Sequence, residues 1–378
     1  MIPPFASRPA PKLVFGPGTL GELPALVREA GGSAVFLVSD TGIARAGHTG
    51  RARRLLEDAG IPVALYDHSH ENPTEADAAA CRDAARAAKF DCFVALGGGS
   101  SLDTAKAANF LLTNGGAMRD YHGYGKATRP LLPLIAIPTT AGTGSECQSY
   151  ALVSRDDTHE KMACGDPKAR AYAAILDPEL TATQPRAVAV LTGLDALSHA
   201  LESAVTSKRN ALSTPYAEAA FRHLASALGR VLAGKAALEE RGAMQLGAAL
   251  AGLAIENSML GAAHATANPL TARHNVVHGH AVALMLPAVM RFNAGDPAAA
   301  AIYARLERIL REIDPGAPAL IAWVEDIVRR AALPPLDARA MDFAGMADDA
   351  TRQWTGKFNP RPLQAADFVA LYRHAFGN

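Results

Sequence analysis

The sequence predicts two domains: an α/β domain with a parallel, Rossmann-like sheet over residues 1–186, and an all-helical domain over residues 187–378. Up to residue 186, short runs rich in β-branched residues alternate with helical stretches, the pattern of a parallel sheet covered by helices on both faces. Beyond it, β-branched runs almost vanish and long Ala/Leu stretches dominate. The change falls at "TATQPRAV", where Pro185 suits the first turn of a helix.

The first domain begins with a strand at 33–40 ("SAVFLVSD") and a helix at 51–60 that ends at Gly60. Each later strand is again an apolar run bounded by turn residues, and each helix is Ala-rich or amphipathic. The further strands are expected at 61–67, 91–100 and 133–140, and the further helices at 74–88 and 101–112.

The second domain is expected to consist of helices because its Ala/Leu stretches exceed the usual length of a strand. These stretches are 187–206, 213–233, 238–267, 279–292, 298–312 and 318–331.

Composition excludes several classes of protein. Lys plus Arg number 37 and Asp plus Glu number 37, so no net charge would attract nucleic acid or an anionic membrane, and neither is expected as a partner. No stretch reads as a membrane span, and the N-terminus lacks the apolar region of a signal peptide. The four cysteines form no CxxC pair. We therefore expect a cytoplasmic protein.

A glycine loop, "VALGGGSSLDTAKA" (94–107), lies between the third strand and its helix. Gly97, Gly98 and Gly99 would let a phosphate approach the backbone, and Ser100 could cap a helix whose N-terminus favours an anion. Asp103 lies in the first turn. A tight turn with a helix-start charge is the alternative interpretation, since the loop is not GxGxxG and does not follow the first strand.

A second polar loop, "IPTTAGTGSE" (137–146), follows the fourth strand and offers the hydroxyls of Thr139, Thr140 and Thr143. Ligands of open α/β sheets bind at the carboxyl ends of the strands, where both loops are expected. Asp40 also ends a strand; it could accept hydrogen bonds from a ribose 2′-OH, or be an ordinary turn residue.

A polar stripe interrupts an apolar helix at "GLDALSHALE" (193–202), where Asp195, His199 and Glu202 share one face. Asp195 and His199, together with His264, expected near the end of a helix, and His278, expected at the start of the next, offer one carboxylate and three imidazoles. This set suits Fe²⁺ or Zn²⁺ rather than Ca²⁺ or Mg²⁺. Glu202 could support a ligand from behind or be a helix-edge charge. Each histidine taken alone is more often an ordinary core or surface residue.

Together these motifs resemble the iron-containing (group III) alcohol dehydrogenase family, in the dehydroquinate synthase-like superfamily. The resemblance runs from "VFGPGTLGEL" (14–23) through "ENPT", "GGGSSLDTAK", "IPTTAGTGSE", "DPEL" and "GLDALSHALE" to "LPAVMRFNA" (286–294), in family order and spacing. It implies that residues 1–186 bind a dinucleotide and that residues 187–378 form the metal-binding catalytic domain. It also implies a homodimer or larger homo-oligomer.

The resemblance implies specific site residues. The metal ligands would be Asp195, His199, His264 and His278, holding one divalent ion, Fe²⁺ or alternatively Zn²⁺. An acid at position 40 implies NAD rather than NADP. The cofactor site would comprise Asp40, Asn72, Gly97, Gly98, Gly99, Ser100, Asp103, Thr139, Thr140, Thr143, Lys161 and Leu180.

Two positions depart from, or vary within, the family. Many members carry a second histidine four residues after the third ligand, assigned to proton transfer, whereas this chain has Asn268. His280, close to a ligand, is a candidate substitute as proton relay, the other route being direct transfer to water. Tyr150 occupies a variable substrate-pocket position and suggests a narrower or aromatic-lined pocket.

The function predicted from these residues is reversible hydride transfer between NAD(H) and a primary alcohol or small aldehyde, with the metal acting as a Lewis acid. One alternative is a dehydroquinate synthase-like lyase or cyclase, which would give no net NADH. The other is a nucleotide-binding module without catalysis, which would turn over no alcohol.

Overall fold

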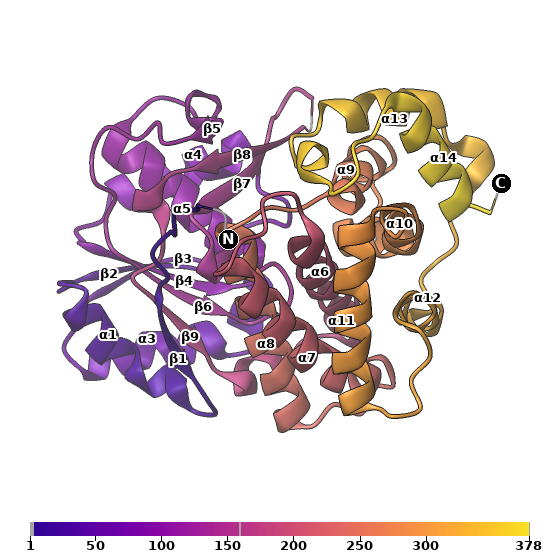
Figure 1. Ribbon diagram of the computed structural model, residues 1–378. Coiled ribbons are helices and arrows are strands. Elements are labelled where there is room, and N and C mark those ends of the chain that lie inside the picture. Colours follow the sequence, from indigo (N-terminus) through magenta and orange to yellow (C-terminus); the bar gives the residue numbers. More distant parts are fainter. Residues whose placement is uncertain (1–3, 159, 378) are drawn as a thin grey trace. The chain divides into compact units, whose positions relative to one another are not determined.

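The computed structural model describes residues 4–158 and 160–377. The chain divides into two compact units. Arg8–Gln184 form the first; residues 185–377, joined by residues 4–7, form the second. In Figure 1 the first unit runs from indigo to magenta and contains the strands, and the second continues to yellow and is helical. The predicted fold class, an α/β region followed by an all-helical region, is confirmed.

The first unit contains a six-stranded parallel sheet, in the order β1-β9-β6-β4-β2-β3, and a small three-stranded sheet, in the order β5-β8-β7. The strands are β1 (Lys12–Phe15), β2 (Val35–Val38), β3 (Val63–Tyr66), β4 (Cys92–Gly97), β5 (Gly123–Tyr124), β6 (Leu134–Pro138), β7 (Tyr150–Ser154), β8 (Lys161–Gly165) and β9 (Ala173–Leu176).

Helices cover both faces of the large sheet, and successive side chains along a strand point to opposite faces. Val35 and Leu37 of β2 pack toward α1 (Leu23–Glu29) and α3 (His48–Asp58). Phe36 and Val38 pack on the other side, toward α4 (Glu75–Arg86) and α5 (Gly99–Asn114). A strand buried on both faces reads as a continuous apolar run, which is why these central strands were predictable. The short α2 (Thr41–Arg45) follows β2.

The edge strand β1, its neighbour β9 and the three-stranded sheet were not predicted. The residues of β9, "AAIL", include two alanines with little intrinsic preference for a strand. These residues form a strand because they pair with β1 on one side and β6 on the other. Buried Asp177 connects this edge to the N-terminal loop, because its carboxylate accepts the amides of Gly18 and Leu20, both at 3.1 Å.

The second unit is built around α6 (Arg186–Val205), whose residues from Gly193 onward are all buried. The other helices are α7 (Ser213–Leu232), α8 (Leu238–Glu256), α9 (Ala262–His274), α10 (His278–Asn293), α11 (Pro297–Ile313), α12 (Leu320–Ala331), α13 (Phe343–Arg352) and α14 (Ala365–Ala375). The single helix expected over 238–267 is wrong: α8 ends at Glu256, residues 257–261 are not helical, and α9 begins at Ala262.

The expectation that no stretch resembles a membrane span also needs correction. Helix α6 passes the criteria of length and apolar composition for a span, with a mean hydropathy of 1.2. However, 78% of that window is buried within the protein, so its apolar surface packs against other helices.

Candidate functional site

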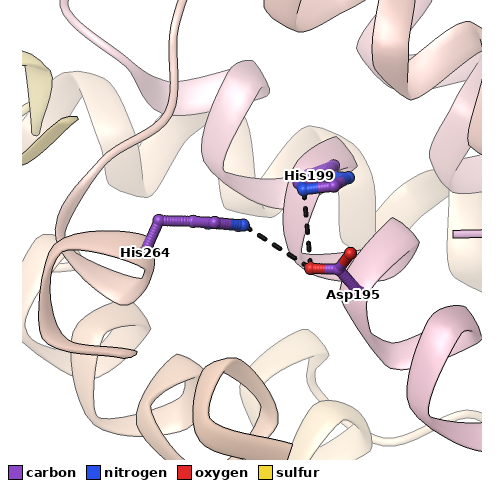
Figure 2. A group of neighbouring side chains, drawn as sticks. All are labelled: Asp195, His199 and His264. Atoms are coloured by element: carbon purple, nitrogen blue, oxygen red, sulfur yellow. Dashed lines mark ion pairs between the residues drawn. The ribbon is translucent and has the colours of Figure 1, made fainter. Parts of the chain in front are cut away.

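Three helices of the second unit bring the four candidate metal ligands together. Asp195 and His199 lie one turn apart on α6, His264 lies in the first turn of α9, and His278 begins α10. The Asp195 Oδ1 atom lies 3.5 Å from His199 Nε2, 3.5 Å from His264 Nε2 and 3.9 Å from His278 Nε2. Figure 2 shows His199 and His264 both directed at the same oxygen of Asp195.

The expected place of His264 near the end of a helix is wrong, because the break at 257–261 puts it at a helix start. The start of α10 packs directly against α6. A Cβ on Gly279 would lie 2.4 Å from the Leu191 carbonyl oxygen, so only glycine allows this approach. Gly279 thereby lets the preceding residue, His278, reach Asp195.

Asp195, His199 and His264 are buried and His278 is partly exposed, and the polar atoms of the cluster are incompletely satisfied. Asp195 Oδ1 and His264 Nε2 have no hydrogen-bond partner within residues 4–158 and 160–377. Uncompensated polar atoms of this kind are costly in a protein interior. A divalent cation ligated by a carboxylate and imidazoles would satisfy both atoms, so the residues fit the metal that the motifs imply.

The charges around Asp195 and His264 reinforce one another. Burial alone would raise the pKa of Asp195, but the imidazoles of His199, His264 and His278 hold it well below its usual range. Burial alone would lower the pKa of His264, but the carboxylates of Glu202 and Asp195 raise it to about 9. Glu202 makes the contact expected of a supporting residue, with Oε2 2.5 Å from His264 Nδ1.

The two residues considered for proton transfer lie in different surroundings. The Asn268 side chain, one turn after His264, donates a hydrogen bond to Gln353 Oε1 at 2.8 Å. His280 lines a cavity of about 300 Å³ with the end of α12 and residues 332–336, a set that includes none of the four candidate ligands. Residues two apart on a helix do not share a face, so this placement lends no support to a relay through His280, which stays a prediction.

In the first unit, the glycine loop and the threonine loop lie against each other. They follow the neighbouring strands β4 and β6, and the Thr139 amide donates to the Gly97 carbonyl at 2.9 Å. A Cβ on Gly99 would lie 2.6 Å from Thr143 Cγ2, so the absent side chain makes room for the second loop. Buried Thr139 Oγ1 has no hydrogen-bond partner in the part of the chain that the structure describes.

Asp40 and Asn72 also lie beside the glycine loop. The strand order reverses between β2 and β4, and ligands of such sheets bind at this point. Asp40 follows β2; its Oδ1 caps α2 by accepting the Ile43 amide at 2.9 Å, and its Oδ2 accepts the Ser101 hydroxyl at 3.1 Å. Asn72, with φ of 51°, donates its backbone N–H to Ser100 Oγ at 3.2 Å.

The remaining predicted residues of this unit are dispersed. Lys161 begins β8. The side chain of Leu180 is fully buried in the hydrophobic core. Tyr150 begins β7, where its ring packs on Gly165 and against Tyr124, with the two ring centroids 5.6 Å apart.

Lys106, which sequence reasoning missed, connects α5, the helix after the glycine loop, to residues 145–150. This lysine of α5 is 1% exposed and donates to Ser145 O, Ser145 Oγ, Gln148 O and Tyr150 O at 2.6–3.0 Å. Ser145 Oγ in turn donates to Asp103 Oδ1 at 2.7 Å, and burial raises the pKa of Asp103. The available signal was a lysine in the apolar stretch "TAKAANFLL".

The contact between the two loops predicts different costs for alanine at neighbouring glycines. Gly99→Ala would place Cβ 3.0 Å from Thr143 Cβ, which no rotation of the threonine relieves. We expect this overpacking to lower the free energy of unfolding by about 1–3 kcal/mol. Gly98→Ala, with 3.4 Å to Thr140 Cγ2, is the matched control and should cost less than about 1 kcal/mol. Chemical denaturation of the cofactor-free protein measures both; equal losses would contradict this packing.

Two family models match the chain. One, described as iron-containing alcohol dehydrogenase, matches residues 10–178, and one for the C-terminal part of the Fe-containing alcohol dehydrogenase family matches residues 189–376. The chain is 32% identical over 366 residues to alcohol dehydrogenase 4 of Schizosaccharomyces pombe, covering 96% of this chain and 87% of that protein.

Solved structures are similar over the whole chain. A crystal structure of 1,3-propanediol oxidoreductase has a TM-score of 0.92 and 29% identity, covering 99% of this chain and 100% of that chain. Sulfoacetaldehyde reductase from Bifidobacterium kashiwanohense, solved in complex with NAD⁺, has a TM-score of 0.86 and 25% identity, covering 100% of both chains.

Proposed function

Because the chain belongs to the iron-containing alcohol dehydrogenase family, we propose that it catalyses reversible hydride transfer between NAD(H) and a primary alcohol or small aldehyde. The observation that carries this proposal is the buried cluster on α6, α9 and α10, in which Asp195 Oδ1 faces three imidazole nitrogens. A buried carboxylate so surrounded suits a cation better than it suits a purely structural role.

In this proposal Asp195, His199, His264 and His278 hold one divalent metal, Fe²⁺ in the first place, with Zn²⁺ also suited to the ligand set. When bound, the metal supplies Lewis-acid polarisation of the substrate oxygen. The helical region, residues 187–378, is then the metal-binding catalytic domain.

The chain's own residues prepare this site in two ways. Glu202 accepts the Nδ1 proton of His264, which fixes the ring and leaves Nε2 as the ligand atom. The apolar residues of α6 around Asp195, all buried from Gly193 onward, keep bulk water from the ligands and so strengthen every charge interaction among them.

For the α/β region, residues 1–186, we propose NAD as the cofactor. The proposed site comprises the predicted set named above, centred on the glycine loop and its neighbours Asp40 and Asn72. The Thr139 hydroxyl, which has no hydrogen-bond partner among the described residues, and the close approach at Gly99 support a ligand at this edge. Sulfoacetaldehyde reductase, similar over the whole chain, is described as an NAD⁺ complex. Asp40 would disfavour the 2′-phosphate of NADP.

The substrate class rests on the relatives and on Tyr150. The similar proteins are described as an alcohol dehydrogenase, a 1,3-propanediol oxidoreductase and a sulfoacetaldehyde reductase, so a small alcohol or aldehyde is proposed here. Tyr150 would narrow the pocket. For the hydroxyl proton we propose direct transfer to water, because Asn268 does not titrate near neutral pH and the cavity that His280 lines includes none of the candidate ligands; a relay through His280 is the alternative route. A cytoplasmic location and a homo-oligomeric assembly stay predictions.

A panel of primary alcohols and small aldehydes, assayed on protein reconstituted anaerobically with Fe²⁺ or with Zn²⁺, tests this function. Net formation of NADH from an alcohol, or its consumption by an aldehyde, is expected with at least one metal. Turnover of no member of the panel with either metal would contradict the proposal. The lyase or cyclase alternative is not favoured, since the reported relatives are oxidoreductases.

A further inference from the structure

The N-terminus of α9 lacks a cap of its own. A helix start leaves backbone N–H groups without intrahelical partners, and a polar side chain at the N-cap position usually accepts one of them. Here the N-cap is Gly261, which has no side chain to offer. A Cβ at this position would lie 3.0 Å from both Asn359 Oδ1 and Glu202 Oε1, so two distant side chains occupy the place where a cap would be.

These two side chains satisfy the first amides of the helix. The Ala262 N–H donates to Asn359 Oδ1 at 3.3 Å, and the Ala263 N–H donates to Glu202 Oε1 at 2.6 Å. The next residue is His264, whose Nδ1 contacts the other oxygen of Glu202. The turn that carries the imidazole is therefore capped from outside, by residues 60 or more positions away in the chain.

Asn359 is itself held in one orientation. Its Nδ2 donates to the Asn293 Oδ1 at 2.6 Å and to the Arg361 carbonyl at 2.7 Å, and its Oδ1 accepts Asn293 Nδ2 at 3.1 Å. Asn293 and Asn359 are both buried. An N–H donor on one side and a carbonyl acceptor on the other allow the amide group only one of its two flips. The Asn293–Asn359 pair thus links the last turn of α10 to the first turn of α9.

We propose that Asn359, held by Asn293, is a positioning residue of the metal site. Its amide oxygen and the carboxylate of Glu202 fix the first turn of α9, and so the direction of the His264 imidazole. A metal site tolerates errors of only about 0.2 Å in ligand distances, so a frayed first turn would cost affinity. The inference rests on the proposed function, because it takes His264 as a ligand.

The test measures Zn²⁺ affinity of the metal-free protein by competition with a chromogenic chelator, and the visible spectrum of the Co²⁺ form. Asn359→Ala removes the acceptor and is expected to weaken Zn²⁺ binding about 10–100-fold and to alter the Co²⁺ spectrum. Asn293→Ala leaves Asn359 in place but removes the two side-chain contacts that hold its amide group. It is expected to weaken Zn²⁺ binding as well, by up to about tenfold.

Asp296→Ala is the matched control. Asp296 caps α11 by accepting the Ala299 amide at 2.8 Å, and α11 carries none of the proposed ligands. This change should lower the melting temperature while leaving Zn²⁺ affinity and the Co²⁺ spectrum unchanged.

The inference is overturned if Asn359→Ala binds Zn²⁺ as tightly as the unaltered protein, or if Asp296→Ala weakens binding equally. Should Asn359→Ala not fold, Asn293→Ala decides alone: a loss of Zn²⁺ affinity of about threefold or more supports the role, and affinity equal to that of the unaltered protein overturns it. If the unaltered protein and His199→Ala bind Zn²⁺ equally, the proposed metal site fails, which is a different result from failure at Asn359 alone.

Discussion

Replacing His199 with alanine is expected to remove the metal and nearly all turnover while leaving the fold intact. The substitution deletes one of four ligands from a buried site, and the Lewis-acid contribution of a catalytic metal amounts to several kcal/mol. A loss of about 4 kcal/mol corresponds to a rate about 10³-fold lower. The helix itself should persist, because alanine favours helix more than histidine does and α6 is held by its apolar neighbours.

Elemental analysis, circular dichroism and steady-state kinetics on one preparation measure this effect. His223→Ala is the matched control, since this half-buried histidine lies on α7, outside the ligand set. It should retain both metal and rate. Full metal occupancy in the His199 variant would show that His199 is not a ligand.

Replacing Asp40 should narrow or reverse a preference for NAD over NADP. Its carboxylate would lie beside the 2′-phosphate of NADP, and like charges brought together cost several kcal/mol, where each 1.4 kcal/mol is about tenfold. Asp40→Gly removes the charge and makes room for the phosphate. It also removes the cap of α2, but glycine at an N-cap costs only a few tenths of a kcal/mol.

Asp40→Asn removes the negative charge while keeping the size of the side chain and its ability to cap α2, so it measures the effect of the charge alone. Asparagine caps a helix about as well as aspartate, so the Ile43 contact should persist while the negative charge is lost. We expect Asp40→Asn to lower the ratio of kcat/KM for NAD to kcat/KM for NADP, and Asp40→Gly to lower this ratio further. Equal kcat/KM values for the two cofactors in the unaltered protein would show that Asp40 does not select the cofactor.

The parts of the fold that the sequence predicted are those set by local pattern. The β2 run "VFLV" is apolar at every position because both its faces are buried. On α6, Asp195 and His199 stand out because nearly every neighbour is Ala, Leu or Gly. The strand β9 and the break before α9 depend instead on distant partners. Nothing near Gly261 shows that Glu202 and Asn359 will cap the helix, so the sequence suggested one continuous helix over 238–267.

In the candidate site, too, the features set by local sequence were predicted and those set by distant contacts were not. The glycine and threonine loops were expected at the same edge of the sheet because each follows a predicted strand. They lie against each other because those strands, β4 and β6, are neighbours. Lys106 was missed because a lysine in a helix normally lies in solvent, and only the fold shows four acceptors around its ammonium group. The closeness of His280 to His278 in the sequence predicts a relay; the structure places His280 in a cavity toward α12, and the relay stays a prediction.

The measurement that tests the central claim most directly is the fate of the hydrogen on the alcohol carbon. A primary alcohol deuterated at C1, incubated with NAD⁺ and the Fe²⁺-loaded protein, should yield NADH that carries one deuterium at nicotinamide C4, detected by mass spectrometry. The His199→Ala protein, measured in parallel, should yield essentially none. Reduced cofactor without deuterium, or equal deuterium transfer by the His199 variant, would contradict metal-dependent hydride transfer at this site.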